Sequence, residues 1–97
     1  MDLRDFQQLI EKMYSQKDRE RGPAGTFLWL VEEIGELATA IGEGSSRDKA
    51  DEFADVLAWL ATLANIEGVD LTEAIEAKYG KGCPGCGRYI CQCDEKP

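Results

Sequence analysis

The sequence predicts an all-α fold with a short cysteine-rich tail. Apolar residues recur three and four positions apart, capping residues together with Gly and Pro interrupt this pattern, and no segment alternates like a convincing strand. We expect a four-helix domain over residues 1–80 and a tail over residues 81–97. The chain has 97 residues, near the lower end of the usual domain size, so a second subunit is expected to help complete the bundle.

The first two helices are expected on either side of a turn. Apolar side chains follow one helical face over residues 2–19, and Asp2 is the expected N-cap. A Gly-Pro turn then interrupts the helical pattern. Pro23 suits the first turn of a second helix, which we expect to run to about Ile41.

The third and fourth helices are expected to begin at capping residues. Ser45 followed by Asp48 resembles a capping box, and the helix that it starts should continue to about Glu67. Asp70 is the expected cap of a short fourth helix that ends near Tyr79.

The composition excludes several classes of function. The net charge of -8 argues against binding a nucleic-acid polymer, because there is no excess of Lys and Arg to displace counterions. No apolar run approaches the roughly 20 residues needed to span a bilayer, so no membrane partner is expected. Met1 is followed by Asp2 rather than by a signal-peptide pattern, and we therefore expect a cytoplasmic protein.

The absence of His limits the chemistry further. Imidazole is not available as a base or a ligand, and the Ser-His and Cys-His nucleophile systems are excluded. There is also no Gly-rich phosphate loop. Any reaction must therefore be run by carboxylates, metal ions and water.

Five acidic residues lie within two of the most apolar segments of the chain. They are Glu32, Glu33 and Glu36 in the expected second helix, and Glu52 and Asp55 in the expected third helix. Positions three apart are neighbours on a helix, so Glu33 pairs with Glu36 and Glu52 pairs with Asp55. Two such helices packed face to face would form a carboxylate box, which must take up protons or bind cations.

The expected third helix favours a metal site over a solvated acidic face. Glu52 and Asp55 fall within its apolar stripe, whereas Thr62 falls on the predicted solvent side. The other members of that stripe are Val56, Trp59, Leu63 and Ile66. The expected second helix carries no basic residue that could pair with the carboxylates.

Oxygen ligands on rigid helices select hard cations such as Mg²⁺ or Mn²⁺. The missing His argues against a di-iron centre, which combines Glu with Glu-x-x-His. Mg²⁺ is commonly bound by a few carboxylates together with substrate phosphates, so the pattern indicates phosphate-anhydride chemistry.

The two acidic segments resemble the signature of a known family. Glu32-Glu33-Ile34-Gly35-Glu36, followed by Glu52-Phe53-Ala54-Asp55, is similar to the two-part motif of the MazG-like nucleotide pyrophosphohydrolases, the all-α nucleoside triphosphate pyrophosphatases. The resemblance covers about residues 3–80. It implies hydrolysis of a nucleoside triphosphate to the monophosphate and pyrophosphate, in nucleotide-pool house-cleaning, by a homodimer or homotetramer.

The same resemblance implies a role for each acidic residue. Glu33, Glu36, Glu52 and Asp55 would be the Mg²⁺ ligands. Glu32 would bind a further metal ion or orient the attacking water as general base.

Four other residues are candidates for substrate contacts. Trp29 lies one turn before Glu33 and could stack on the base, although a core or interface position would explain a Trp equally well. Lys78 near the end of the fourth expected helix could contact phosphate, and Arg47 and Lys49 are rivals for that role. The alternative for each is that it is simply solvated, as most Lys and Arg residues are.

The tail gathers all four cysteines of the chain, which are Cys83, Cys86, Cys91 and Cys93. The first pair, Cys-x-x-Cys flanked by Gly, is typical of a zinc knuckle, and the second, Cys-x-Cys, is tighter. Two disulfides are the alternative, but cytosolic thiols are normally kept reduced. We expect a closed structural Zn²⁺ site on which the fold of the tail depends.

A non-enzymatic function is the alternative to hydrolysis. In that reading the chain is a helical adaptor whose zinc tail binds a protein and whose acidic site is vestigial. The intact set of acidic residues argues against it, because a decayed site would be expected to lose some of them.

Overall fold

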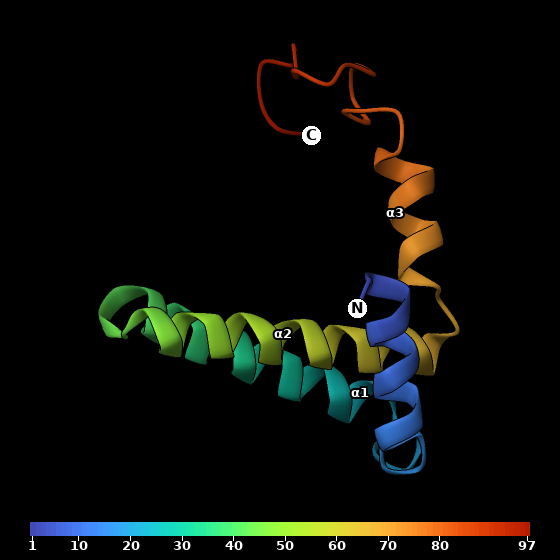
Figure 1. The fold of residues 1–97 in the computed structure, drawn as a ribbon, viewed down its shortest axis with the longest axis vertical. Helices are drawn as coiled ribbons and strands as arrows, with labels where there is room; N and C mark the ends of the chain where they lie inside the picture. Colours follow the sequence, from blue (N-terminus) through green and yellow to red (C-terminus); the bar gives the residue numbers. More distant parts are fainter.

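The computed structural model describes residues 1–97 and confirms that the chain is all-α. It contains α1 (Leu3–Glu43), α2 (Ser46–Glu67) and α3 (Leu71–Tyr79), and no strand (Figure 1). Residues 80–97 follow α3 without helix or strand. None of the helices combines the length and the apolar character needed to cross a membrane.

The predicted break between the first two helices is confirmed, because α1 consists of two helical arms joined by a sharp bend at the expected turn. Only Gly22 leaves the helical conformation, with φ 80° and ψ 173°. A positive φ is readily adopted by Gly alone, and Pro23 suits the first turn of the helical segment that follows. The chain therefore changes direction at a single residue, and α1 has two arms that cross steeply (Figure 1).

The second arm of α1 and α2 form an antiparallel helical hairpin (Figure 1). The predicted capping box at the start of α2 is confirmed: Ser45 Oγ accepts from Asp48 N at 3.1 Å, and Asp48 Oδ2 accepts from Ser45 N at 3.0 Å. A Cβ at Gly44 would lie 2.8 Å from Ala40 O, so the tight connection requires Gly there. This hairpin sets the two acidic segments beside each other.

The first arm of α1 is tied to the connection between α2 and α3 by one buried amide. Gln7 Nε2 donates to Asn65 Oδ1 at 3.0 Å and to Val69 O at 2.7 Å. Gln7 Oε1 accepts from Leu71 N at 2.9 Å. All of these polar groups are satisfied, so the network can fix the first arm against the hairpin without a desolvation penalty.

The core of the single chain is small. Only nine of the 97 residues are buried, and the apolar ones are Ile10, Leu30, Ala40, Ala61 and Ala64. Large apolar side chains on the second arm of α1 remain exposed, among them Phe27 at 54% and Leu28 at 70%. The chain alone therefore does not bury the apolar surface that its helices present.

The prediction that Thr62 faces solvent was wrong, because this residue is 4% exposed. The helical wheel assumed that α2 packs on one side only. The first arm of α1 covers a second side of α2, where Ile10 and Thr62 line the same cavity. The neighbouring Ala61, which is fully buried, is small enough to allow that close approach.

Candidate metal and substrate site

The helical hairpin brings three of the predicted metal ligands together. Glu33 and Glu36 lie one turn apart on the second arm of α1, and Glu52 comes from α2. One carboxylate oxygen from each of the three lies within 4.8 Å of the others. We call these three residues the carboxylate cluster.

The carboxylate cluster has no cation from the protein to compensate its charge. Glu33 Oε2 and Glu52 Oε2 are buried, and neither has a hydrogen-bond partner. The three ion pairs of the structure lie elsewhere and join Arg4 to Asp70, Arg19 to Glu11 and Arg21 to Asp18. Buried carboxylate oxygens without partners are unfavourable, so this arrangement needs protons or an added cation.

The raised pKa values of two residues in the carboxylate cluster also indicate that it needs a proton or an added cation. Burial, followed by repulsion from Glu36, raises the pKa of Glu33 from 4.5 to about 7, and the charges of Asp55 and Glu52 add to the shift. Burial, followed by the charges of Glu36 and Asp55, also raises the pKa of Glu52. The carboxylate cluster therefore favours a bound proton near neutral pH unless another positive charge replaces it.

The donor set suits a hard divalent cation. Its atoms are carboxylate oxygens only, they converge within the span of a metal coordination sphere, and two of them have unfilled lone pairs in a buried position. These are the properties of Mg²⁺ and Mn²⁺ sites, whose remaining positions are filled by water or phosphate oxygens.

The other two acidic residues of the sequence motif lie at the edge of this group. Asp55 is exposed and is not among the converging oxygens, although its charge still raises the pKa of Glu33. Both Glu52 and Asp55 were predicted to point inward, because they fall within the apolar stripe of their helix. In the single chain Glu52 is half-buried, which agrees in part, whereas Asp55 is exposed. Glu32 is exposed and lies outside the converging group.

Two cavities flank the carboxylate cluster along the hairpin. Toward the α1–α2 connection lies an acidic cavity of about 560 Å³, lined by Glu36 and Glu52 together with Glu43 and Asp48. Anionic phosphates would be repelled there unless cations neutralised the walls. This cavity contains no basic residue.

Toward the bend of α1 lies a cavity of about 350 Å³ with a different lining. Asp55 stands at its edge, and Tyr14, Lys17, Arg21 and Trp59 form much of its wall. Lys17 is exposed and takes part in none of the ion pairs of the structure. This cavity therefore combines basic and aromatic side chains with acidic ones, unlike the wholly acidic cavity toward the α1–α2 connection.

One side of this second cavity is held rigid by stacked groups. Arg21 Nη1 and Nη2 each donate to Asp18 Oδ1 at 3.2 Å, and Nη1 also donates to Thr26 Oγ1 at 3.1 Å. The Arg21 guanidinium lies 4.8 Å from the centroid of the Trp59 ring. Trp59 in turn stacks on Trp29 with centroids 5.7 Å apart and planes 13° apart.

The predicted substrate residues lie apart from this cavity. Trp29 contacts it only through Trp59 and is 46% exposed. Lys78 places its ammonium 5.7 Å from the ring centroid of its neighbour Tyr79 on α3. Arg47 and Lys49 lie in the first turns of α2 and line neither cavity beside the carboxylate cluster.

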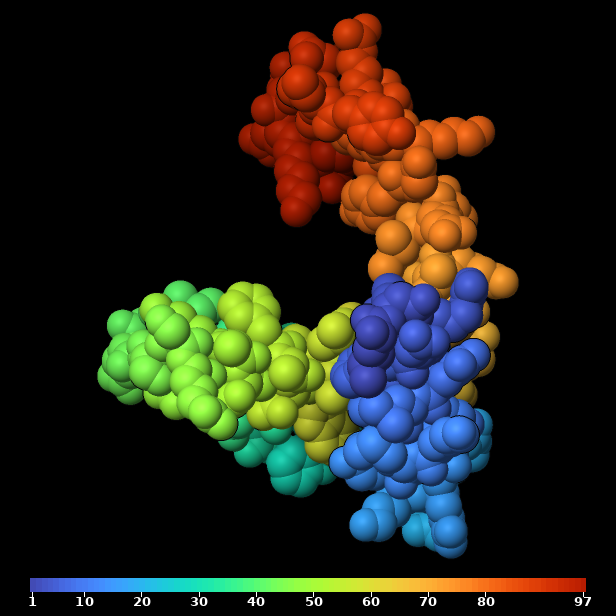
Figure 2. Space-filling model, in the orientation of Figure 1, coloured from blue at the N-terminus to red at the C-terminus, as the bar shows by residue number.

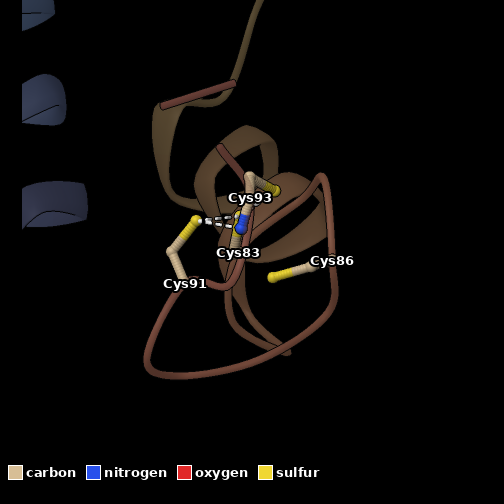
Figure 3. A group of neighbouring side chains, drawn as sticks. All are labelled: Cys83, Cys86, Cys91 and Cys93. Carbon is tan, nitrogen blue, oxygen red and sulfur yellow. Dashed lines mark hydrogen bonds between the residues drawn. The ribbon is translucent and has the colours of Figure 1, made fainter. Parts of the chain in front are cut away.

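Tyr14, Lys17 and Arg21 were not predicted to line a cavity beside the acidic residues. Their spacing of three and four residues places them on one face of the first arm, and this signal was present in the sequence. Its significance depends on the bend at Gly22, which folds that face back over α2. The four cysteines of the tail do come together (Figure 3). The tail follows the end of α3 that points away from the hairpin (Figure 1).

Comparison with known proteins identifies the family of the chain. The family profile described as "MazG nucleotide pyrophosphohydrolase domain" matches residues 21–86, which include the whole acidic motif. The chain is also 49% identical over 59 residues to a dATP/dGTP diphosphohydrolase of Cyanophage S-2L. That match covers 61% of this chain and 52% of the relative, so about half the length of the relative is spanned. The chain belongs to the MazG nucleotide pyrophosphohydrolase family.

Proposed function

We propose that the protein hydrolyses a nucleoside triphosphate between the α and β phosphates, releasing the monophosphate and pyrophosphate. The reaction would depend on Mg²⁺ or Mn²⁺ held by Glu33, Glu36, Glu52 and Asp55. The observation that carries this proposal is the pair of buried, partnerless oxygens, Glu33 Oε2 and Glu52 Oε2, in a cluster with no protein cation. Membership of the MazG family supports the reaction class.

In this proposal, residues of the carboxylate cluster bind the cation, and residues of the neighbouring cavity contact the phosphates. A divalent cation supplies charge for the phosphoryl oxygens and lowers the pKa of water. Glu33, Glu36, Glu52 and Asp55 would hold this cation from two helices. Lys17 and Arg21 line the cavity next to Asp55, where they would neutralise phosphate oxygens that extend beyond the cation.

Glu32 is proposed as the residue that takes the proton of the attacking water or binds a further cation. Its exposed side chain lies one position from Glu33 on the same helix. Replacing Glu32 with Gln removes the proton acceptor but keeps the size and polarity. A loss of turnover with unchanged cation binding would support the base, and a parallel loss of cation binding would support a ligand.

We also propose that the protein works as a homo-oligomer, a homodimer or homotetramer. The small core and the exposed Phe27 and Leu28 support association, because contiguous apolar surface of this kind is usually covered. Multi-angle light scattering of the purified chain tests this. A monomeric mass at micromolar concentration would contradict it.

The preferred substrate follows from the named relative as a proposal only. Since the chain is similar to a dATP/dGTP diphosphohydrolase, we expect purine deoxynucleoside triphosphates to rank high among the substrates. Removal of such nucleotides from a cytoplasmic pool is the proposed biological setting.

The test is a panel of canonical and modified ribonucleotide and deoxyribonucleotide triphosphates, including dATP and dGTP, incubated with Mg²⁺ and the purified chain. The expected products are a monophosphate and pyrophosphate, which distinguish this reaction from release of a diphosphate and phosphate. Glu36→Gln should abolish it, and Glu76→Gln on α3 is the matched control. If no substrate is hydrolysed and Glu36→Gln leaves cation binding unchanged, the adaptor function becomes the better account.

A further inference from the structure

We propose that Cys83, Cys86, Cys91 and Cys93 bind one Zn²⁺ in a closed, four-thiolate site that folds the tail, residues 81–97. The proposed hydrolysis does not use this part of the chain. The four sulfur atoms come together from both halves of the tail (Figure 3), and all lie within 4.8 Å of one another.

The distances between the thiols match a tetrahedral zinc site. A Zn–S bond of about 2.3 Å with tetrahedral angles requires neighbouring sulfur atoms to be about 3.8 Å apart. Cys83 Sγ lies 3.6 Å from Cys91 Sγ and 3.9 Å from Cys93 Sγ. All four cysteines are free thiols at these separations, so the arrangement is that of metal ligands and not of two disulfides.

The backbone of the tail is shaped around these sulfur atoms. Cys83 N donates to Arg88 O at 2.8 Å and Gly87 N donates to Cys83 O at 2.7 Å, which closes the loop that carries the first pair of cysteines. Gly87 has φ 73°, a conformation that suits Gly directly after Cys86. A Cβ at Gly85 would lie 2.8 Å from Cys93 Sγ, so a larger residue there would displace the thiol.

Backbone N–H groups also point at the sulfur atoms. Gln92 N donates to Cys86 Sγ at 3.4 Å, and Cys93 N donates to Cys91 Sγ at 3.3 Å. Such hydrogen bonds from the surrounding shell orient ligating groups and stabilise the negative charge of thiolates. The thiols would release their protons to solvent when the metal binds.

The tail has no hydrophobic core of its own, because none of its residues is buried. It contains no helix or strand, and its large apolar side chains are exposed, with Tyr89 at 89% and Ile90 at 80%. A segment of this length without a core cannot offset its loss of conformational entropy. A bound Zn²⁺ would provide that free energy, and removal of the metal would unfold the tail alone.

The site is structural and independent of the hydrolytic centre. Four protein ligands fill a tetrahedral shell and leave no position for water or substrate. Open space separates the tail from the tip of the α1–α2 hairpin (Figure 2). The family match ends at residue 86, so Cys91 and Cys93 lie beyond it.

The test measures zinc on the full chain purified under reducing conditions, by elemental analysis and native mass spectrometry. We expect one Zn²⁺ per chain that survives dialysis, and none in Cys91→Ser or Cys93→Ser. Gln92→Ser is the matched control, because it lies between these cysteines and keeps the backbone N–H that points at Cys86. Glu33→Gln should retain the zinc, which separates this site from the carboxylate cluster.

Two further readouts distinguish loss of the site from loss of the fold. Circular dichroism should show unchanged helix content in Cys93→Ser, while limited proteolysis should cleave the tail of that variant faster than the tail of Gln92→Ser. Co²⁺ added to the metal-free chain should give the visible absorption of tetrahedral thiolate coordination. A purified chain with no zinc and a mass lower by four hydrogens would mean two disulfides and would overturn the proposal, as would equal zinc content in Cys93→Ser and Gln92→Ser.

Discussion

The carboxylate cluster and the four cysteines of the tail both gather side chains that can bind a metal ion as anions, and neither group contains a Lys or Arg. The two groups are assembled in different ways. Glu33, Glu36 and Glu52 meet because two long helices pack, whereas the cysteines meet within one short loop. The first site is built on a packed helical hairpin, which holds its carboxylates together. The second has little surrounding structure, so there the metal and the fold are expected to form together.

The ligand atoms extend this difference to function. Carboxylate oxygens select hard cations that keep exchangeable positions, which chemistry on phosphate needs. Four thiolates close the coordination shell of Zn²⁺ and leave nothing to exchange. One chain would thus carry a site for turnover on its helices and a site for stability in its tail.

The largest expected effect is the loss of hydrolysis in Glu52→Gln. The amide keeps the size of the side chain but not its negative charge, so the cluster would lose cation affinity as well as turnover. We expect kcat/KM to fall about 100-fold or more, since metal charge on a phosphoryl group is worth several kcal/mol. The zinc content should not change, and a parallel loss of zinc would show that the two sites are not independent.

The reverse experiment removes the tail zinc and leaves the carboxylates intact. In Cys83→Ser, the tail should become sensitive to protease, while the rate per chain with saturating Mg²⁺ should stay within about twofold because independent sites contribute additively. Steady-state kinetics measures this. A loss of rate as large as that of Glu52→Gln would mean that the tail supports the hydrolytic site.

A third prediction concerns the rigidity of the hairpin that preorganises the carboxylates. Arg21→Gln leaves Asp18, which is 3% exposed, without its cation, and should lower the free energy of unfolding by about 3 kcal/mol. Arg19→Gln is the matched control, since its pair with Glu11 is exposed and should contribute less than about 1 kcal/mol. Equal effects of the two changes in urea denaturation would contradict the structural role of Arg21.

A smaller effect is expected at the bend. Gly22→Ala places a Cβ on a residue with φ 80° and ψ 173°, a conformation essentially restricted to Gly, which should destabilise the fold by about 1–3 kcal/mol. Gly42→Ala lies inside the helix with open space around it, and there Ala should stabilise by about 0.5–1 kcal/mol. Thermal unfolding compares them, and a neutral Gly22→Ala would show that the bend can be made without a positive φ.

The effect of pH on the stability of the metal-free protein is expected to be modest and to come from the carboxylate cluster. The pKa of Glu33 is raised in the folded chain, so its stabilising contribution is complete below about 4.5 and is lost as the pH rises through about 7. Without divalent cations the Tm of the helical domain should therefore fall over this range. Mg²⁺ should remove the fall, because the cation replaces the proton, and a Tm that rises instead would contradict the raised pKa.

The features that the sequence predicted correctly are those set by neighbours along the chain. The caps at Asp2, Ser45 and Asp70 are confirmed, because each is a side chain that bonds to its own first turn. The Glu33 and Glu36 pair follows from helical spacing. Its approach to Glu52 required only that the two acidic helices form a hairpin.

The features that were missed depend on tertiary packing. Tyr14, Lys17 and Arg21 face the site only because Gly22 reverses the first arm onto α2. Thr62 is buried for the same reason, since a helix covered on two sides has a wider buried face than its apolar stripe indicates. Periodicity within one helix does not contain the direction from which another helix arrives.

The measurement that tests the central claim most directly is Mn²⁺ binding to the full chain, followed by electron paramagnetic resonance after the zinc content has been fixed. Mn²⁺ stands in for Mg²⁺ at oxygen ligands. The account predicts saturable binding that is lost in the Glu33→Gln, Glu52→Gln double variant and retained in Cys93→Ser. Undiminished Mn²⁺ binding in the double variant, with its helices intact, would contradict it.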